Sequence, residues 1–569
     1  MPDREQPMRD LAMPVRTPAP GPVHVRAEPG SGVASAAISA PRRRRSRDWM
    51  LPVGFSLFAT LVALLGSWIP SLWEDEAASL LSASRPLGSL FLMLGHIDAV
   101  HGAYYLGLHG WIDVFGGSPF SIRFPSAVAV GLCAAAVVLL VRRLGSTRTA
   151  ILAGMVCAFL PRLTYAGEEA RSYAFSAAIA AWLTVLLIEL LSRSRPDPAG
   201  PNRAQPTRMR WVAYAALLAL GIYCFLYVGL IVAAHAAIVL WKRPGKGFVR
   251  TWALAAAVGL AAAVPIGVWA FRERSQIAYL ATRPQVTPDS ILVGLWFGYS
   301  AAAVIAWALI AAAVGAAAAA AIVRRRRAGE LPTRSQQPIQ QPIQQSAPQP
   351  QLPSLELIAA CWLFIPAVLL IVPGAFMAAF TPRYLTLCAP ATAILIACGI
   401  ARLAALKRLP TRRRTLAAVI ATAVVLAAMV PAYLVQRGPY AKNNSDWAEI
   451  SAVVGAHATP GDAVLFDHSV PQSRRPELAL HTYPADFSGL NDVLLETPYT
   501  RNTSWADTMY SVPQAVALGR FAGVRRVWLV EYATPTHADT WGLAELRALD
   551  FATVAHYRTF RSAIIELSR

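Results

Sequence analysis

Three consecutive acidic residues follow closely on the first long apolar segment of the chain. Residues 51–70 are almost entirely apolar, and Glu74, Asp75 and Glu76 come shortly after them. A carboxylate at the bilayer centre costs about 2.5–3.5 kcal/mol on insertion scales, whereas one at the mouth of a span meets water and stays charged. Such a carboxylate can accept a proton from an attacking hydroxyl. The structural alternative is that these acids only begin a helix, where acidic residues are favoured.

Further polar residues are expected at the same face of the membrane. Arginine binds phosphate oxygens through paired N–H donors, and a nearby carboxylate can take up a proton. Together these residue types favour a reaction on an anionic substrate held at a lipid surface. The group comprises His96, Asp98, His101, Arg123, Glu168, Glu169, Arg171, Arg383 and Tyr384.

Several of these residues also have a structural interpretation. His101 on its own is more typical of an interfacial residue than of a ligand. Arg171 lies at the end of an apolar segment, from which its side chain can extend to the interface. Arg383 could simply anchor the helix that follows it, and Arg123 is expected to be structural.

The composition is that of a polytopic membrane protein. Of 569 residues, 55% are hydrophobic and 15% are charged, and the mean hydropathy is +0.43. A soluble domain of this size carries more charge. Apolar segments of about 20 residues, enough to cross a core of roughly 30 Å, recur along the chain. The predicted fold class is an all-α polytopic membrane protein, with about eleven transmembrane helices, followed by a soluble α/β domain.

The net charge of +20 does not indicate a nucleic-acid partner. Basic residues form short blocks at the ends of apolar segments, as cytoplasmic loops do under the positive-inside rule. No surface of basic and aromatic residues accompanies them, so we expect no nucleic-acid binding. The blocks are 42–45, 142–143, 324–327 and 412–414.

The basic blocks also predict the topology. Residues 1–48 are expected to form a disordered basic cytoplasmic tail, and 49–70 an uncleaved first helix. The outer loop 71–121 follows, in which the aromatic stretch 103–115 is suited to the membrane interface. Repeated Gln-Gln-Pro-Ile units mark 328–353 as a flexible cytoplasmic linker.

The predicted transmembrane domain covers residues 49–435. Its block 211–241 is long for one helix and short for two, and a tight turn at 223–227 would make it a hairpin. With this hairpin the chain crosses the membrane an odd number of times, so the C-terminus is expected on the outer side. The other spans are expected near 122–141, 149–165, 172–191, 251–270, 291–323, 355–376, 384–404 and 415–435.

Residues 436–569 differ in kind and are expected to form a small extracytoplasmic α/β domain. Short β-forming runs alternate there with helical patterns, and a Pro-Gly-Asp turn precedes the first run. Its His468, Arg474, Arg475 and Tyr483 are more typical of surface residues than of a site for acceptor glycan or a partner. The β-forming runs are 463–466, 526–530 and 562–567, and the helical patterns are 446–456 and 543–549.

The six cysteines indicate neither a disulfide nor a metal site. All lie in apolar segments, and none has a CxxC spacing, so they are expected to be small buried hydrophobic residues. They are Cys133, Cys157, Cys224, Cys361, Cys388 and Cys398.

Several short motifs follow one another in a definite order. They are Asp75-Glu76-Ala77, His101-Gly102-Ala103-Tyr104-Tyr105, Phe115-Gly116, Arg123-Phe124-Pro125-Ser126, Glu168-Glu169-Ala170-Arg171-Ser172-Tyr173 and Pro382-Arg383-Tyr384-Leu385. This set resembles the dolichyl-phosphate-mannose protein mannosyltransferase-like family (family 39 type), which has the GT-C fold. The likeness is strongest over residues 70–240 and weaker up to 435. Asp446-Trp447 and Pro460-Gly461-Asp462 resemble the outer domain of many bacterial members.

The resemblance implies roles for individual residues. Asp75 matches the acid of the first outer loop that acts as base or orients the acceptor, and Glu76 follows as a supporting acid. His101 falls where the family has a His or Lys near the donor phosphate. Arg383, with Tyr384 beside it, matches a late Arg-Tyr motif that can touch the same phosphate.

Two further residues, Glu169 and Arg171, match the second outer loop, where members of the family vary. The chain departs from the family pattern after His101, because Gly102 and Ala103 stand where the family has Pro-Pro. The local backbone is therefore expected to differ there.

Members of this family transfer a sugar from a polyprenyl-phosphate carrier to an acceptor on the outer face. The resemblance thus implies a hexosyltransferase, mannose being the first candidate, that acts on a glycan, lipid or protein of the envelope. We therefore expect a multi-pass protein of the bacterial plasma membrane, and the basic residues before the first span predict a cytoplasmic N-terminus. The chain lacks a Gly-rich phosphate loop, so no nucleotide site is expected. No spacing requires a metal, although a divalent metal at the acidic cluster stays open.

Three other functions compete with this one. A transporter or flippase for a lipid-linked glycan would carry charges at mid-span and internal repeats, but no repeat is found and the polar residues gather at one face. An arabinose-type pentose or aminoarabinose transferase would share the same fold. A structural scaffold of the envelope is the remaining alternative.

Overall fold

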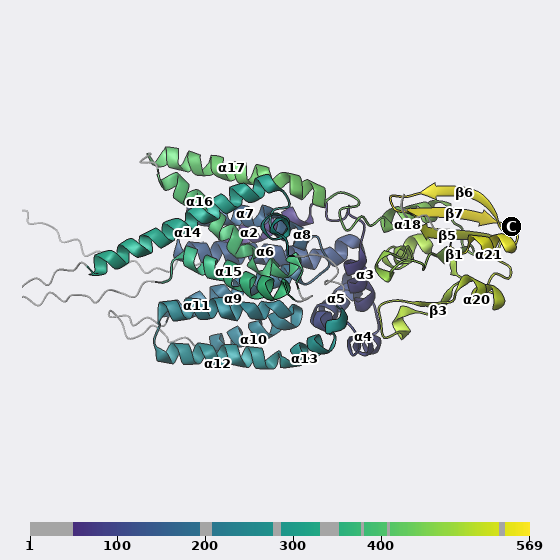
Figure 1. The fold of residues 1–569 in the computed structure, drawn as a ribbon, viewed down its shortest axis with the longest axis horizontal. Helices are drawn as coiled ribbons and strands as arrows, with labels where there is room; N and C mark the ends of the chain where they lie inside the picture. Colours follow the sequence, from purple (N-terminus) through teal and green to yellow (C-terminus); the bar gives the residue numbers. More distant parts are fainter. Residues whose placement is uncertain are drawn as a thin grey trace, which may run out of the picture. The chain divides into compact units, whose positions relative to one another are not determined.

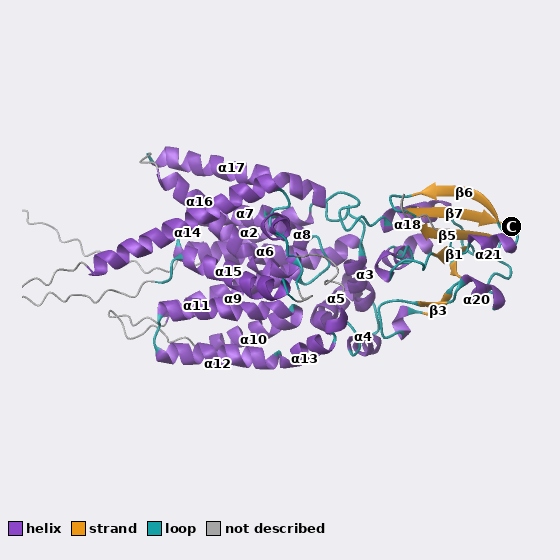
Figure 2. Ribbon diagram, in the orientation of Figure 1, coloured by secondary structure: helices purple, strands orange, loops and turns teal. Residues whose placement is uncertain are grey.

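The computed structural model describes residues 49–193, 208–276, 286–329, 352–376, 380–406, 410–533 and 541–569. Helices make up most of the described chain, and strands occur in its C-terminal part (Figure 1 and Figure 2). The predicted tail 1–48 and most of the linker 328–353 lie outside the described residues.

Six helical segments in the described ranges are long and apolar enough to cross a membrane. Two bent pairs would raise this number to eight, so the chain is a multi-pass membrane protein. The bent pairs are α7 (Thr147–Phe159) with α8 (Pro161–Gly167), at 56°, and α12 (Lys246–Ala262) with α13 (Val264–Arg272), at 45°. The six are α6 (Pro119–Leu144), α9 (Tyr173–Arg193), α14 (Ser300–Gly329), α15 (Leu355–Gly374), η5 (Pro382–Cys388) with α16 (Ala389–Leu406), and α17 (Thr411–Gln436).

Eleven crossings require three shorter helices to cross as well, which stays a prediction. The block 211–241 does break into two helices, and the break at Phe225 lies inside the predicted turn. The shorter helices are α2 (Met50–Leu64), α10 (Arg208–Cys224) and η2 (Leu226–Leu230) with α11 (Ile231–Lys242).

Helix α2 packs closely on α6. A Cβ on Gly131 of α6 would come within 2.0 Å of the Thr60 hydroxyl and 2.5 Å of the Ser56 carbonyl oxygen. Only glycine allows this approach, and α6 in turn packs on α7 and α9. The acidic run after α2 thus follows a helix that packs on well-buried helices of the membrane domain.

The predicted outer loop 71–121 is largely helical. It contains α3 (Glu74–Ala83), α4 (Leu87–Leu94), the short η1 (Ala99–His101) and α5 (Gly102–Phe115). The stretch 103–115 is thus helical, and it buries aromatic side chains such as Tyr105. Helix α3 packs on α5 and on α19 (Leu478–Thr482) of the C-terminal domain.

The C-terminal part is a small α/β domain, as predicted. Its five-stranded sheet has the order β2-β1-β5-β7-β6, in which β1 pairs in parallel with β2 and β5, and the other pairings are antiparallel. The strands are β1 (Ala463–Phe466), β2 (Asn491–Asp492), β3 (Leu495–Thr497), β4 (Thr508–Met509), β5 (Arg526–Tyr532), β6 (Ala552–Arg558) and β7 (Ser562–Ser568). The longer helices are α18 (Trp447–His457), α20 (Val512–Ala517) and α21 (Leu543–Ala548).

Two of the four residues expected on the surface of this domain are not surface residues. The Tyr483 hydroxyl accepts a hydrogen bond of 3.0 Å from the Leu72 backbone N–H, which lies before α3. The His468 side chain is 12% exposed and lies 3.1 Å from a carboxylate oxygen of Glu477. The expectation was wrong for Tyr483 because it contacts the membrane part, and for His468 because it packs on side chains of its own domain. The six cysteines are all free, and four are buried.

Candidate active site

Asp75 lies in the first turn of α3, where backbone N–H groups have no partner within the helix and favour acidic side chains. Trp73 is the N-cap residue and has an extended backbone. The preceding residues are fixed to the C-terminal domain, because the Ser445 hydroxyl donates to the Leu72 carbonyl at 2.6 Å. Helix α3 lies at the end of the helical region nearest that domain (Figure 1).

Two arginines from distant parts of the sequence converge on Asp75. Arg171, between α8 and α9, has its Nη2 3.0 Å from Oδ1 of Asp75. Arg383 of η5 donates to Oδ2. The guanidinium of Arg383 also lies 5.6 Å from the ring centroid of Trp73 and 5.8 Å from that of Tyr173. Both oxygens of Asp75 are therefore paired, while 18% of its side chain stays exposed.

The arginines keep Asp75 ionised. Burial by itself raises the pKa of this carboxyl, but Arg383 and Arg171 outweigh it and lower the pKa to about 2. Asp75 is thus charged at neutral pH. It is a weak base for as long as both arginines remain bound to it.

His101 lies at the end of η1, close to the same charges. Burial, followed by the positive charge of Arg171, lowers the pKa of its imidazole to about 3, so the ring is neutral at pH 7. Its Nδ1 is buried and has no hydrogen-bond partner among the described residues. A neutral imidazole can exchange a hydrogen bond with a substrate, but it adds no positive charge beside a phosphate.

A chain of hydrogen bonds from α5 orients Arg171. Its Nη1 donates to the Tyr105 hydroxyl at 3.1 Å, and that hydroxyl donates to Asp98 at 3.1 Å. Asp98 has a left-handed backbone with φ of 58°, and its carboxylate contacts Tyr105 of α5. These contacts leave Nη2 of Arg171 to face Asp75.

Glu76 is fully used by structural contacts. Its two oxygens accept from Arg123 at 2.7 and 2.5 Å, and Oε1 also accepts from the Ala170 N–H at 2.9 Å. Arg123 also donates to the Ser67 carbonyl at 2.6 Å. Glu76 therefore ties α3 to the turn that carries Arg171, and its predicted part in the chemistry becomes one of positioning. With the oxygens of Asp75 paired too, neither acid offers an open ligand to a divalent cation in this arrangement.

Glu168 and Glu169 are buried in the turn after α8. Glu168 lies 3.1 Å from Nη1 of Arg437 and 3.5 Å from Nζ of Lys442. Burial raises the pKa of the Glu169 carboxyl, and the charges of Lys442 and Arg383 oppose that shift. Neither oxygen of Glu169 has a hydrogen-bond partner among the residues described. Glu169 is thus an acceptor left open beside the Asp75 pair.

Arg162 is a further candidate for the site, and it was not among the residues predicted from the sequence. It is the second residue of α8, and its guanidinium lies 5.0 Å from the ring centroid of Tyr165. Its Nε and Nη2 are buried without hydrogen-bond partners in the described chain. It lies close enough to Glu169 and Arg383 to feel their charges. An arginine inside the predicted span 149–165 was the available signal, because charges within spans are commonly functional.

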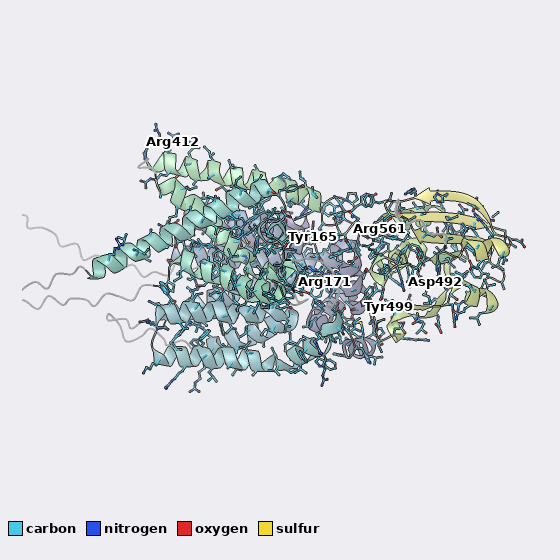
Figure 3. The ribbon with its side chains drawn as sticks, in the orientation of Figure 1. Tyr165, Arg171, Arg412, Asp492, Tyr499 and Arg561 are labelled. Atoms are coloured by element: carbon cyan, nitrogen blue, oxygen red, sulfur yellow. The ribbon has the colours of Figure 1, made fainter. Side chains whose placement is uncertain are left out.

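Tyr384, next to Arg383, packs its ring on Tyr227 with the centroids 4.9 Å apart. It also lines a cavity of about 130 Å³ together with His101, Phe225 and Arg274. The predicted site residues that come together are Asp75, His101, Glu169, Arg171, Arg383 and Tyr384. Figure 3 places Arg171 at the α3 end of the helical region and Arg412 at the opposite end.

Comparisons with known proteins give similar structures but no relative in sequence. No protein-family model and no curated protein sequence matches the chain. The structure is similar to ArnT from Cupriavidus metallidurans bound to undecaprenyl phosphate, with a TM-score of 0.52 and 15% identity, over 90% of this chain and 97% of that one.

Two other solved structures are similar at lower scores. The oligosaccharyltransferase of Archaeoglobus fulgidus in its apo form has a TM-score of 0.48 and 10% identity, over 85% of this chain and 70% of that one. The arabinofuranosyltransferase AftD from mycobacteria has a TM-score of 0.39 and 16% identity, over 90% of this chain and 41% of that one. On the likeness to ArnT, the chain has the fold of the GT-C membrane glycosyltransferases.

Proposed function

We propose that the chain is a glycosyltransferase that moves a hexose, with mannose the first candidate, from a polyprenyl-phosphate carrier to an acceptor in the cell envelope. The observation that carries this proposal is Asp75 held between Arg171 and Arg383. The fold supports it, because ArnT from Cupriavidus metallidurans, which shares that fold, was solved with undecaprenyl phosphate bound.

Binding of the donor would change the pairing of Asp75. A lipid phosphate offers oxygens that guanidinium groups bind through paired N–H donors, so it competes with Asp75 for Arg383 and Arg171. The buried N–H groups of Arg162, which have no partner in the described chain, supply further donors nearby. His101 would contribute a hydrogen bond through its open Nδ1.

Release from the arginines would make Asp75 a better base, because its pKa then returns toward the ordinary range. The acceptor hydroxyl attacks C1 of the sugar from the face opposite the phosphate and passes its proton to Asp75. The bond from C1 to the phosphate oxygen breaks as the bond from C1 to the acceptor oxygen forms. The lipid phosphate leaves with one more negative charge, which Arg383 stabilises.

The proposed side of the membrane follows from charge. Arg412 lies in the first turn of α17, at the end of the helical region opposite Arg171 (Figure 3). A basic block of this kind is typical of the cytoplasmic side. The Asp75 site and the C-terminal domain would then face the outer compartment, and the N-terminus the cytoplasm.

Transfer of radiolabelled mannose from polyprenyl phosphate by the purified protein in proteoliposomes tests the proposal. Removing a general base costs about 10²–10⁴ in rate, so Asp75→Asn should lower transfer by that factor. The matched control is Asp113→Asn on α5, where the side chain is 65% exposed and lies 3.5 Å from His109. This control should keep the wild-type rate.

Three other outcomes of this assay would change the proposal. Unchanged turnover in Asp75→Asn would remove the assignment of the base. Label that crosses the bilayer without transfer would indicate a flippase. Transfer from an arabinose-type donor in place of the mannosyl donor would keep the mechanism and correct the sugar to a pentose.

A further inference from the structure

A second cluster of chemically active side chains lies in the C-terminal domain. Glu477 immediately precedes α19, and His481 lies one turn later within that helix. Asp507 reaches both from the segment just before β4. Nε2 of His481 lies 2.8 Å from Oδ2 of Asp507 and 3.9 Å from Oε1 of Glu477. The three donor atoms all lie within 4.8 Å of one another.

These spacings suit a metal ion as well as they suit an ion pair. Zinc binds histidine nitrogen and carboxylate oxygen at about 2.0–2.2 Å in tetrahedral geometry, which places neighbouring donor atoms about 3.3 Å apart. The observed 2.8 and 3.9 Å fall on either side of that value. Residues at i and i+4 lie on one face of a helix, so Glu477 and His481 point to the same place.

The cluster is buried and rich in negative charge. The side chains of Glu477 and Asp507 are 5% and 2% exposed, and that of His481 is 14% exposed. Asp492 adds a third carboxylate close to both acids. Buried carboxylates need a cation or several hydrogen bonds to offset their desolvation. A divalent cation at this point would supply that charge.

The surroundings of the cluster hold its donor atoms in position. His468 lies with its Nε2 3.1 Å from Oε2 of Glu477, the oxygen that does not face His481. The second oxygen of Asp507 accepts from the Tyr499 backbone N–H. The ring of Tyr499 packs edge-on against that of His481, with the centroids 5.2 Å apart. Contacts of this kind orient the ligands of metal sites.

We propose that Glu477, His481 and Asp507 form a binding site for a divalent transition-metal ion of the zinc class, with His468 orienting Glu477. Imidazole and carboxylate ligands favour such ions over magnesium or calcium, which prefer oxygen alone. Three protein ligands leave a coordination position for water. His481 and Tyr499 line a cavity of about 690 Å³, through which an ion can reach the site.

The site would join two parts of the fold. Arg85, just after α3, donates to the Asn502 carbonyl at 2.9 Å and to that of Ser504, and lies 5.4 Å from the Tyr499 ring centroid. A metal bound to Asp507 would therefore tether the segment that contains Asn502, Ser504 and Asp507 to α19. Tyr499 lies on the side of the C-terminal domain toward the helical region (Figure 3). Metal binding at this site does not require the proposed transferase activity.

Calorimetric titration of the full-length, tag-free protein in nanodiscs, after removal of metals with a chelator, tests the proposal with zinc ion alone as the probe. We expect one zinc ion per chain. Affinity should fall at least about 100-fold in His481→Ala and Asp507→Asn, since each loses a ligand. The control His556→Ala alters an exposed histidine of the same domain and should bind zinc as the wild type does.

Two further measurements keep the test decisive if a variant folds poorly. X-ray absorption at the zinc edge of the wild-type complex should show nitrogen and oxygen neighbours at about 2.0–2.2 Å, with a histidine signature. Zinc should also raise the melting temperature of the wild type. The absence of saturable binding to the folded wild type, a shell of water alone, or equal affinity in folded Asp507→Asn would overturn the proposal.

Discussion

At the scale of single residues, the proposed mechanism depends on competition between Asp75 and the donor phosphate for two arginines. Asp75 has both oxygens paired, one with Arg171 and one with Arg383. The pairing keeps the acid charged but makes it a weak base. A phosphate that takes the arginines would supply the leaving-group contacts and free the base in the same event. The proposed chemistry thus depends on guanidinium groups specifically, and not on positive charge alone.

Arg383→Lys tests this dependence. Lysine keeps the charge but loses the paired donors, and a hydrogen bond to a charged group contributes about 1.5–3 kcal/mol, so kcat/KM for the donor should fall about 10–100-fold. The control is Arg272→Lys at the exposed end of α13, where the guanidinium also lies near an aromatic ring, 5.4 Å from that of Trp269. Equal activity of Arg383→Lys and the wild type would show that charge alone suffices.

The pH dependence of transfer follows from the two lowered pKa values. Asp75 has a pKa of about 2 and His101 one of about 3 in the folded protein. Above pH 5 the acid is therefore ionised and the imidazole neutral, so neither titrates in the free enzyme between pH 5 and 8. We predict a kcat/KM profile without an inflection from either group. An inflection near pH 6.5 that disappears in His101→Gln would contradict this prediction.

At the scale of elements, short or broken helices position each site residue. The first turn of α3 carries Asp75, the turn between α8 and α9 carries Arg171, and η5 carries Arg383. The pair formed by Glu76 and Arg123 holds the first two together. The geometry of the site therefore depends on contacts between elements that are remote in the sequence.

Glu76→Gln is predicted to destabilise the membrane domain. Breaking one side of a buried ion pair costs about 3–5 kcal/mol, because the Arg123 charge then remains buried without its partner. The apparent melting temperature in detergent should fall clearly. The control Glu74→Gln, in the same turn, removes a more exposed carboxylate that contacts Asn443 at 2.8 Å and should shift it little. An unchanged melting temperature in Glu76→Gln would show that the pair is not stabilising.

The sequence predicted the elements that have a clear apolar pattern. The runs 463–466, 526–530 and 562–567 are strands β1, β5 and β7, whose side chains are mostly buried. It missed β6, an edge strand that leaves most of its side chains exposed and therefore lacks an apolar run. Inside the predicted loop 71–121, the interfacial stretch 103–115 lies in α5 and the acidic run begins α3, as one interpretation of the sequence had it, whereas α4 was not predicted.

The site was predictable only in part. Asp75, Arg171 and Arg383 were identified by residue type and by the expected face of the membrane. Their contacts with one another could not be predicted, because the contacting residues lie as many as 308 positions apart in the sequence. Arg162 was missed because it follows Pro161 inside an apolar block, which the structure shows to bend by 56° at that point.

At the scale of the whole molecule, the C-terminal domain is attached to the helices that form the site. Arg85 is fully buried between α3 and α4 and reaches the segment 499–504. The Asn443 side chain donates to Glu74 at 2.8 Å, and the Tyr483 hydroxyl accepts from Leu72. The start of α3 is thus held by both parts of the chain.

Arg85→Ala is predicted to loosen this attachment. The variant leaves the Asn502 and Ser504 carbonyls without their donor, so hydrogen exchange across residues 495–509 should become faster. Arg520→Ala is the control, because Arg520 also lies 5.4 Å from a tyrosine ring but is exposed. Unchanged protection of 495–509 in Arg85→Ala would show that the domain is held elsewhere.

The most direct measurement is a cryo-electron microscopy structure of Asp75→Asn with the polyprenyl-phosphate sugar bound, since loss of the base should trap the donor before transfer. We predict the lipid phosphate within about 2.7–3.0 Å of Arg383, and C1 of the sugar turned toward residue 75. A donor phosphate bound at the Arg412 end of the helices, or out of reach of Arg383, Arg171 and Arg162, would contradict the account.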